Sequence, residues 1–178
     1  LLNYILPLLT IPYLVRVLDL DNYGLIFFSL AIIGVFQVIV DYGFNISATK
    51  EVAKNKHDNE KLLEIFNTVM FIKFILALIC LIILLLGIIF IDVVSKNMYI
   101  YIFTYGIVIG EMLFPFWMFS GLEKMKFAMI INVFSKSIFT LLIFIFVNNE
   151  NYLLVPVFNS LGFIFAGMIS IFILKNKF

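Results

Sequence analysis

Long runs of apolar residues, separated by short charged or Asn-rich breaks, fill the sequence from end to end. The pattern predicts six such runs, at approximately 1–18, 24–49, 65–91, 98–119, 127–147 and 153–174. Because a helix rises about 1.5 Å per residue, about 20 apolar residues cross a hydrocarbon core of about 30 Å. None of the runs has the charged face that a helix of a soluble bundle presents to water. We therefore expect an all-α membrane protein with six transmembrane helices.

The composition supports this class and excludes several others. Hydrophobic residues make up 64% of the chain and charged residues 13%, whereas about a quarter of a soluble domain is charged. A net charge of +1 gives no general basic field, so nucleic acid is not an expected partner. Cys80 and His57 stand apart in the sequence, so neither a metal site nor another cofactor is expected. The sequence has no nucleotide-binding glycine motif and no long loop for catalytic residues, so we expect a transporter rather than an enzyme.

Lysine residues concentrate in alternate breaks between the runs. These breaks hold Lys50, Lys54, Lys56 and Lys61, then Lys124 and Lys126, then Lys175 and Lys177. The breaks on the other side carry only Arg16 and Lys96. The positive-inside rule places the lysine-rich breaks in the cytoplasm, and both ends of the sequence then lie on that side. Because Leu1 already lies inside an apolar run, we expect the sequence to be an excerpt of a longer chain.

Four charged side chains interrupt the apolar runs, one in each of the second to fifth. They are Asp41, Lys73, Glu111 and Lys136. Inserting such a side chain costs about 2.5–3.5 kcal/mol, so these positions are informative. Counted from the cytoplasmic breaks at 1.5 Å per residue, all four fall about 13–18 Å from the inner loops. The sequence therefore predicts one layer of two acids and two bases.

Polar residues at helical spacing accompany these charges in two of the runs. The second run contains Gly34, Gln37, Asp41 and Asn45, and the fifth contains Asn132, Ser135, Lys136 and Thr140. Spacings of three and four residues place each set on one helix face, and lipid would reject that face. Two interpretations follow. The stripes either form buried ion pairs and hydrogen bonds that fix helix packing, or they line a hydrated cavity that binds a polar headgroup or relays ions.

Other residues predict local features of the helices. Pro115 removes a hydrogen-bond donor from the fourth run, so a kink is expected there. Gly162, Ala166 and Ser170 lie four residues apart, which predicts a close-packing face on the sixth run. Trp117 lies near the end of the fourth run, where interfacial aromatic residues are common.

Three segments carry a resemblance to a known family. They are Pro12 to Leu18 followed by Asn22-Tyr23-Gly24, Asp41 to Ala53, and Trp117 to Lys126. In this order and spacing they resemble the Wzx-type flippases of the polysaccharide biosynthesis protein family, within the multidrug/oligosaccharidyl-lipid/polysaccharide exporter superfamily. The resemblance covers essentially the whole sequence. It implies an exporter fold of two lobes, in which residues 1–178 form the N-terminal six-helix transmembrane lobe.

The resemblance also implies a function and a place in the cell. Such a flippase moves undecaprenyl-diphosphate-linked oligosaccharide repeat units across the bacterial inner membrane, for the synthesis of O-antigen or capsular polysaccharide. The implied partners are the lipid-linked oligosaccharide, membrane lipid and the polysaccharide polymerase machinery.

The residues expected to line a translocation cavity share a polar or charged side chain at or near a span. They are Arg16, Gln37, Asp41, Asn45, Lys73, Glu111, Asn132 and Lys136. The resemblance implies that Lys73 and Lys136 contact the diphosphate, with Arg16 at the outer mouth. Asp41 and Glu111 would position these bases or titrate in coupled transport. The amides of Gln37, Asn45 and Asn132 would bond sugar hydroxyls.

Two other functions stay open at this point. One is a multidrug or small-molecule antiporter of the same superfamily, for which we expect a mostly aromatic and acidic cavity. The other is a structural membrane subunit, in which the charged layer only holds the helices together.

Overall fold

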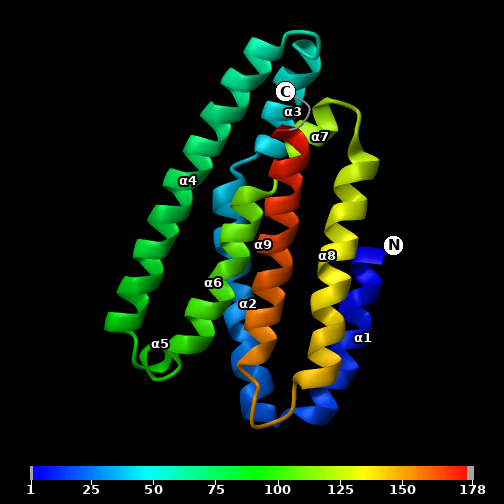
Figure 1. The fold of residues 1–178 in the computed structure, drawn as a ribbon. Coiled ribbons are helices and arrows are strands. Elements are labelled where there is room, and N and C mark those ends of the chain that lie inside the picture. The colour runs from blue at the N-terminus through cyan, green and yellow to red at the C-terminus, as the bar shows by residue number, and fades with distance from the viewer. Residues whose placement is uncertain (1, 176–178) are drawn as a thin grey trace.

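The structure is a computed structural model that describes the backbone of residues 2–175 and the side chains of residues 10–175. Within these residues all regular secondary structure is helical, and there is no strand (Figure 1). Its nine helices are α1 (Leu2–Val17), α2 (Leu20–Asp41), α3 (Phe44–Lys54), α4 (Asn59–Phe90), α5 (Asp92–Lys96), α6 (Met98–Leu113), α7 (Phe116–Gly121), α8 (Met125–Phe146) and α9 (Leu154–Lys175). The predicted fold class is therefore confirmed.

Five helical stretches are long and apolar enough to cross a membrane. They are Leu20–Lys54, Asn59–Phe90, Met98–Gly121, Met125–Phe146 and Leu154–Lys175, which correspond to the second to sixth predicted spans. The first predicted span corresponds to α1, whose 16 residues reach about 24 Å. Leu1, with which that predicted span begins, lies outside the described residues. The chain is thus an all-α, multi-pass membrane protein.

Two of the spans are interrupted, and both interruptions have a local cause. Tyr42 and Gly43 adopt positive φ angles of 45° and 76°, which ends α2 and lets α3 begin in a new direction. Pro115 separates α6 from α7, as the sequence predicts. The two short helices that result, α3 and α7, pack against each other. The Thr49 hydroxyl donates a hydrogen bond to the Trp117 carbonyl oxygen at 3.2 Å and joins them.

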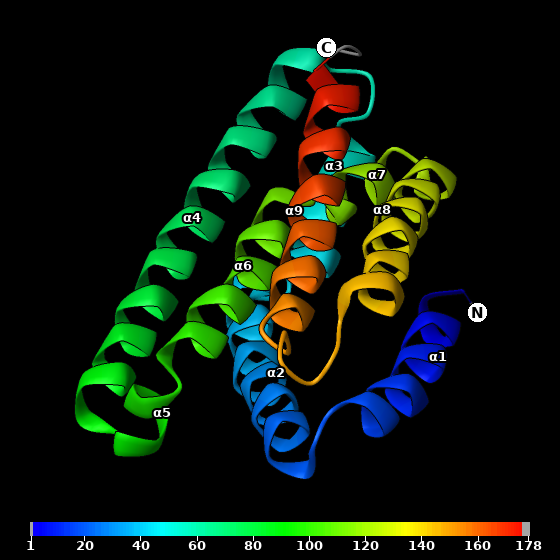
Figure 2. The ribbon, with the colours of Figure 1, turned by 60° about the horizontal axis from the view of Figure 1, so that its bottom comes forward.

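The longer helices pack around a central pair, α6 and α9 (Figures 1 and 2). Helix α2 packs against α6, and α8 packs against α9. Helix α1 contacts α8 and, less extensively, α2. Helix α4 lies on the other side of the bundle, against α2 and α6, and leans away from the rest. This arrangement places α1, α2, α6, α8 and α9 around one side of the lobe.

Small residues allow the central helices to approach closely. A Cβ atom added at Gly110 would meet the Phe163 backbone, and would lie 2.6 Å from the Ile164 nitrogen. A Cβ atom added at Gly167 would lie 2.6 Å from the Leu113 Cβ. In lipid, such close approach replaces the hydrophobic effect as a source of helix association. Of the predicted close-packing residues, Gly162 is buried against α8, where its added Cβ would lie 3.7 Å from the Lys136 Cα.

Aromatic residues near the span ends do not all lie at the interface. Trp117, expected there from its position in the sequence, is 0% exposed. The break at Pro115 redirects α7 over the bundle, so the Trp117 ring packs 6.1 Å from the ring of Phe66 in α4. The expectation for Trp117 was therefore wrong, because sequence position alone does not show where a redirected helix points.

Replacing Gly110 with alanine is expected to destabilise the lobe. The new methyl group would meet the backbone of α9, which cannot shift as easily as a side chain. Such overpacking lowers the free energy of unfolding by about 1–3 kcal/mol. The measurement is the melting temperature of the full-length protein in detergent, which should fall for G110A. The matched control is G87A in α4, where nothing lies within 4 Å of an added Cβ, so its melting temperature should stay or rise slightly. Equal melting temperatures for the two variants would contradict this packing.

Candidate functional site

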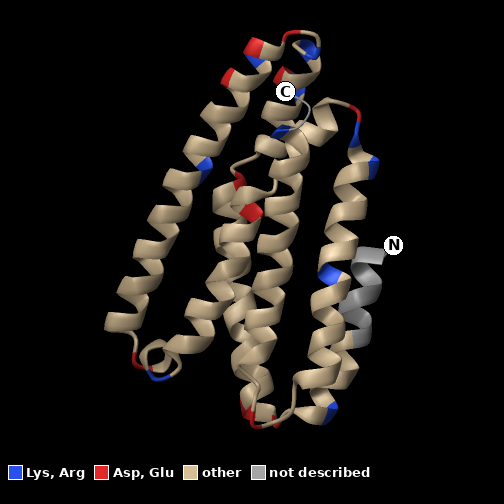
Figure 3. Ribbon diagram, viewed as in Figure 1, with Lys and Arg blue, Asp and Glu red and all other residues tan. Residues whose placement is uncertain are grey.

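Charged residues gather at the two ends of the bundle and are few between them (Figure 3). Two of the interior charges form an ion pair: the Lys73 Nζ of α4 lies 3.3 Å from the Asp41 Oδ1 at the end of α2. The Lys73 side chain is 1% exposed and the Asp41 side chain 24% exposed. The Asn45 amide of α3 donates a hydrogen bond of 2.9 Å to the other oxygen of Asp41. This cluster joins three helices, which fits the interpretation of buried polar contacts that fix packing.

Glu111 lies beside this cluster, partly buried near the end of α6. Its carboxylate interacts electrostatically with Lys73, Lys136 and Asp41. Glu111 makes no direct ion pair with any residue that the structure describes. Glu111 is therefore near enough to both lysines to interact with them, but of the four interior charges only Lys73 and Asp41 form a direct ion pair.

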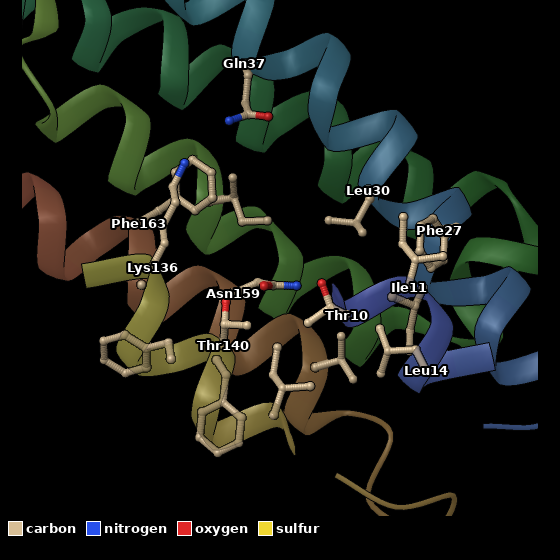
Figure 4. A pocket seen from close by; sticks show the side chains of 17 residues that line it. Thr10, Ile11, Leu14, Phe27, Leu30, Gln37, Lys136, Thr140, Asn159 and Phe163 are labelled. Carbon is tan, nitrogen blue, oxygen red and sulfur yellow. The ribbon is translucent and has the colours of Figure 1, made fainter. Parts of the chain in front are cut away.

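A separate cavity of about 280 Å³ opens among α1, α2, α6, α8 and α9. Figure 4 shows polar side chains from several of these helices directed into it. The polar lining residues are Thr10, Gln37, Lys136, Thr140 and Asn159. The aromatic lining residues are Phe27, Phe139, Phe158 and Phe163, and the remainder of the lining is mostly aliphatic. The cavity therefore combines aromatic walls, a few hydrogen-bonding groups and one cation, as many ligand-binding cavities do.

Lys136 is the one ionisable residue among those that line the cavity. Its Nζ lies over the Phe163 ring, 3.8 Å from the ring centroid. The negative face of the ring attracts the ammonium group and compensates part of its lost hydration. None of its three N–H donors is used in a hydrogen bond within the described part of the chain. A cation with unused donors therefore faces the cavity.

Three more polar groups of the cavity lack a protein partner. Gln37, Thr140 and Asn159 make no side-chain hydrogen bond with any described residue. In the packed core, the hydroxyls of Ser29 and Thr104 lie 3.0 Å apart and each bonds a backbone carbonyl, whereas the Ser135 hydroxyl has no hydrogen-bond partner among the described residues. An amide without partners in an apolar environment costs several kcal/mol, so water or a ligand must bond these groups. The cavity therefore offers hydrogen-bonding groups to water or to a ligand.

The spacing of residues on α8 and α9 explains why these side chains converge. Gly162 brings the two helices together next to Lys136. Thr140 lies one helical turn beyond Lys136, and Asn159 lies about one turn before Gly162. Because α8 and α9 are antiparallel neighbours, Thr140 and Asn159 come to the same level of the cavity (Figure 4). Lys136 and Phe163 occupy the level next to it.

One end of the cavity is sealed by packing between α1, α2, α8 and α9. Leu14, Ile26, Ile143 and Val155 line this end and belong to one buried apolar cluster. The Tyr13 hydroxyl bonds the carbonyl oxygens of Phe144 and Val147 at 3.1 and 3.0 Å. Outside the cluster, the Asp19 amide donates to the Asn149 Oδ1 at 3.1 Å. These hydrogen bonds thus hold the C-terminal end of α1 against the C-terminal end of α8.

The predicted site residues are divided between these features. Gln37 and Lys136 line the cavity, whereas Asp41, Asn45 and Lys73 form the ion-pair cluster. Arg16 is exposed in the last turn of α1 and does not line the cavity. Asn132 lies one turn before Lys136 on α8, partly buried, with its Oδ1 atom buried and unpartnered.

The sequence reasoning missed two polar residues of the cavity, Thr10 and Asn159. Asn159 could have been recognised from the sequence, because it is a polar residue within an apolar run, three residues before Gly162. Thr10 could not, since a lone threonine in a span commonly bonds its own helix backbone. No group of three potential metal-ligating His, Cys, Asp or Glu residues occurs in the described part of the chain.

Comparisons with known proteins identify a family. The sequence matches the polysaccharide biosynthesis protein family over residues 1–178. It is 35% identical, over 98% of its length, to a protein of Escherichia coli (strain K12) named "Putative O-antigen transporter", and covers 42% of that protein. It is 32% identical, over 99% of its length, to a Shigella dysenteriae protein of the same name, and covers 44% of it. No solved structure matches the chain.

The chain therefore spans less than half the length of the curated relatives that it matches. The family match, in contrast, extends over all 178 residues and agrees with a helical bundle built for a membrane. The chain belongs to the polysaccharide biosynthesis protein family.

Proposed function

We propose that the protein is a flippase that moves undecaprenyl-diphosphate-linked oligosaccharide repeat units across the bacterial inner membrane, for O-antigen or capsular polysaccharide synthesis. Membership of the polysaccharide biosynthesis family and the transporter names of two relatives support a transport function. The observation that carries the proposal is the cavity between membrane-spanning helices, which Lys136 and three polar side chains without a hydrogen-bond partner among the described residues line.

The chemistry of the cavity suits the headgroup of such a lipid. A lysine ammonium binds phosphate oxygens as a compact charge, and Lys136 has all of its donors available for them. The amide of Gln37 lies in the same cavity and adds donors and an acceptor. The polyprenyl chain needs no protein cavity, because it is soluble in the surrounding lipid. Lys136 and Gln37 therefore hold the headgroup, while the tail stays in the bilayer.

We further propose that this chain is the N-terminal lobe of a two-lobed exporter. Its coverage of 42% and 44% of two relatives leaves room for a second lobe of similar size. The cavity of this lobe would then form one wall of a translocation pathway between the lobes. The polymerase machinery that consumes the flipped repeat units is the expected partner.

The ion-pair cluster has a different role in this proposal. Because Lys73 is bonded to Asp41 and almost completely buried, it positions α2, α3 and α4 rather than contacting the headgroup. Glu111 connects this cluster electrostatically with Lys136. A cavity for cationic drugs would be acidic, yet none of the described residues that line this one is Asp or Glu. The lining thus favours an anionic headgroup over the antiporter alternative.

The substitution K136M is expected to abolish transport without loss of protein. A strain that lacks its repeat-unit flippase would receive the full-length protein, and surface polymer and membrane abundance would be measured together. Since Lys136 makes no hydrogen bond with any described residue, methionine should be tolerated in the fold, while the headgroup loses its cationic contact. Normal polymer from a normally abundant K136M protein would contradict the proposal.

The matched comparison is K73M, which should lower abundance instead. Removing one partner of a buried ion pair costs about 3–5 kcal/mol, because the other charge stays behind uncompensated. The double substitution K73M/D41N should restore much of the abundance and the polymer. If K136M also loses abundance and a second neutral replacement does not recover it, the charged residues serve only structure, as in a structural membrane subunit.

The proposed orientation places the lysine-rich α3–α4 turn in the cytoplasm. A cysteine introduced as K56C lies on an exposed residue of that turn, in a background that carries C80A. A membrane-impermeant thiol reagent added to intact cells should leave K56C unlabelled, and should label it after the membrane is permeabilised. A cysteine at Asn149, in the loop between α8 and α9, is the opposite control and should react in intact cells. Reversal of the two patterns would overturn the orientation.

A further inference from the structure

We infer that the cavity binds an uncharged sugar residue of the lipid-linked ligand, and that Asn159 and Thr140 are the residues that contact this sugar. The inference rests on the proposed function and specifies the class of sugar that this lobe accepts. Four features of the cavity carry it: its charge, its hydrogen-bonding groups, its aromatic walls and its size.

The described lining of the cavity has no second cation that could neutralise an acidic sugar. Lys136 is its one cation among the described lining residues, and a diphosphate would occupy that cation. The one further charge that influences Lys136 among the described residues is the carboxylate of Glu111. A uronic or sialic acid in this space would therefore be desolvated without a counter-ion and repelled by Glu111.

The hydrogen-bonding groups next to Lys136 match a sugar. Asn159 offers two N–H donors and a carbonyl acceptor, and Thr140 offers a hydroxyl that both donates and accepts. Neither side chain bonds another described residue, and both lie at one level of the cavity, one turn from Lys136. Sugar hydroxyls also donate and accept at once. A sugar bonded to these residues therefore lies next to a phosphate held by Lys136.

The walls around this level favour a neutral ring. Phe139 and Phe158 flank Thr140 and Asn159 in the sequence and line the same cavity. The face of an aromatic ring carries partial negative charge, so it attracts the weakly positive C–H groups of a sugar and repels a carboxylate. A cavity of about 280 Å³ is also small for a ligand site, which commonly measures about 300–1,000 Å³. This volume suits one sugar ring, and the apolar cluster closes the end of the cavity beyond it.

Direct binding tests this inference. The full-length protein in phosphatidylcholine nanodiscs is titrated with three polyprenyl diphosphates: the bare lipid, one that carries N-acetylglucosamine and one that carries glucuronic acid. The neutral sugar should strengthen binding about tenfold over the bare lipid, the effect of two net hydrogen bonds. Glucuronic acid should give no such gain.

Variants of Asn159 assign the effect to this residue. In N159L the gain should disappear, so that the N-acetylglucosamine lipid binds no more tightly than the bare lipid. The matched control N67L replaces an exposed asparagine of α4 far along the chain from the cavity and should keep the gain. In N159R the added cation should make the glucuronic acid lipid bind more tightly than the neutral one.

The outcomes separate this inference from the proposed function. If wild-type protein binds the bare lipid but gains nothing from the neutral sugar, or if N159L keeps the gain, the sugar site is overturned and the flippase proposal stands. Equal binding of the acidic and neutral lipids also overturns it. If wild-type protein binds none of the three lipids, the proposed function fails with it.

Discussion

A polar or charged side chain within the hydrocarbon core must be paired, bonded or hydrated, because lipid offers it no partner. This constraint divides the interior polar residues of the chain into two sets. Asp41 forms an ion pair with Lys73 and accepts a hydrogen bond from the Asn45 amide, so these groups are paired across three helices in the packed interior. Lys136 and Asn159 have no hydrogen-bond partner among the described residues and face a cavity, so water or a ligand is needed beside them. The first set holds the lobe together, and the second gives it a site.

The position of the site follows from the packing of small residues. Gly110 and Gly167 let α6 and α9 approach until their backbones are in contact, and Gly162 lets α8 approach α9. Phe163, beside Gly162, then lies under the ammonium group of Lys136. At the other end of the cavity, the hydroxyl of Tyr13 fastens α1 to the last turn of α8. The cavity is therefore the space that remains among α1, α2, α6, α8 and α9 where these helices do not approach one another closely.

Much of this fold is predictable from the sequence, and the reason is physical. Hydrocarbon solvent demands long apolar runs, so spans two to six and the break at Pro115 are visible in the residues themselves. Helical periodicity also places Gln37 and Lys136 on interior faces, and the structure brings both to the cavity.

The sequence alone did not show which residue each polar group would contact. Lys73 and Lys136 look alike as lone lysines in apolar runs, yet one is bonded to Asp41 and the other lies on an aromatic ring. That difference depends on how α4 and α8 are rotated and which helices they contact. Trp117 was misplaced for the same reason, since the redirection of α7 is a tertiary effect. Asn159 was overlooked because its importance depends on Thr140 and Lys136 of another helix.

The central claim is that the cavity is hydrated and takes the ligand, and thiol accessibility tests it most directly. Cysteines would be placed singly at Asn159 and at its neighbour Ser160, in full-length protein that carries C80A. Asn159 lines the cavity, whereas the Ser160 hydroxyl bonds the Phe103 carbonyl oxygen in the contact with α6. We expect a polar thiol reagent to label N159C rapidly and S160C hardly at all, and the lipid-linked oligosaccharide to slow the labelling of N159C. Equal labelling of the two positions, or no protection by the ligand, would contradict the account.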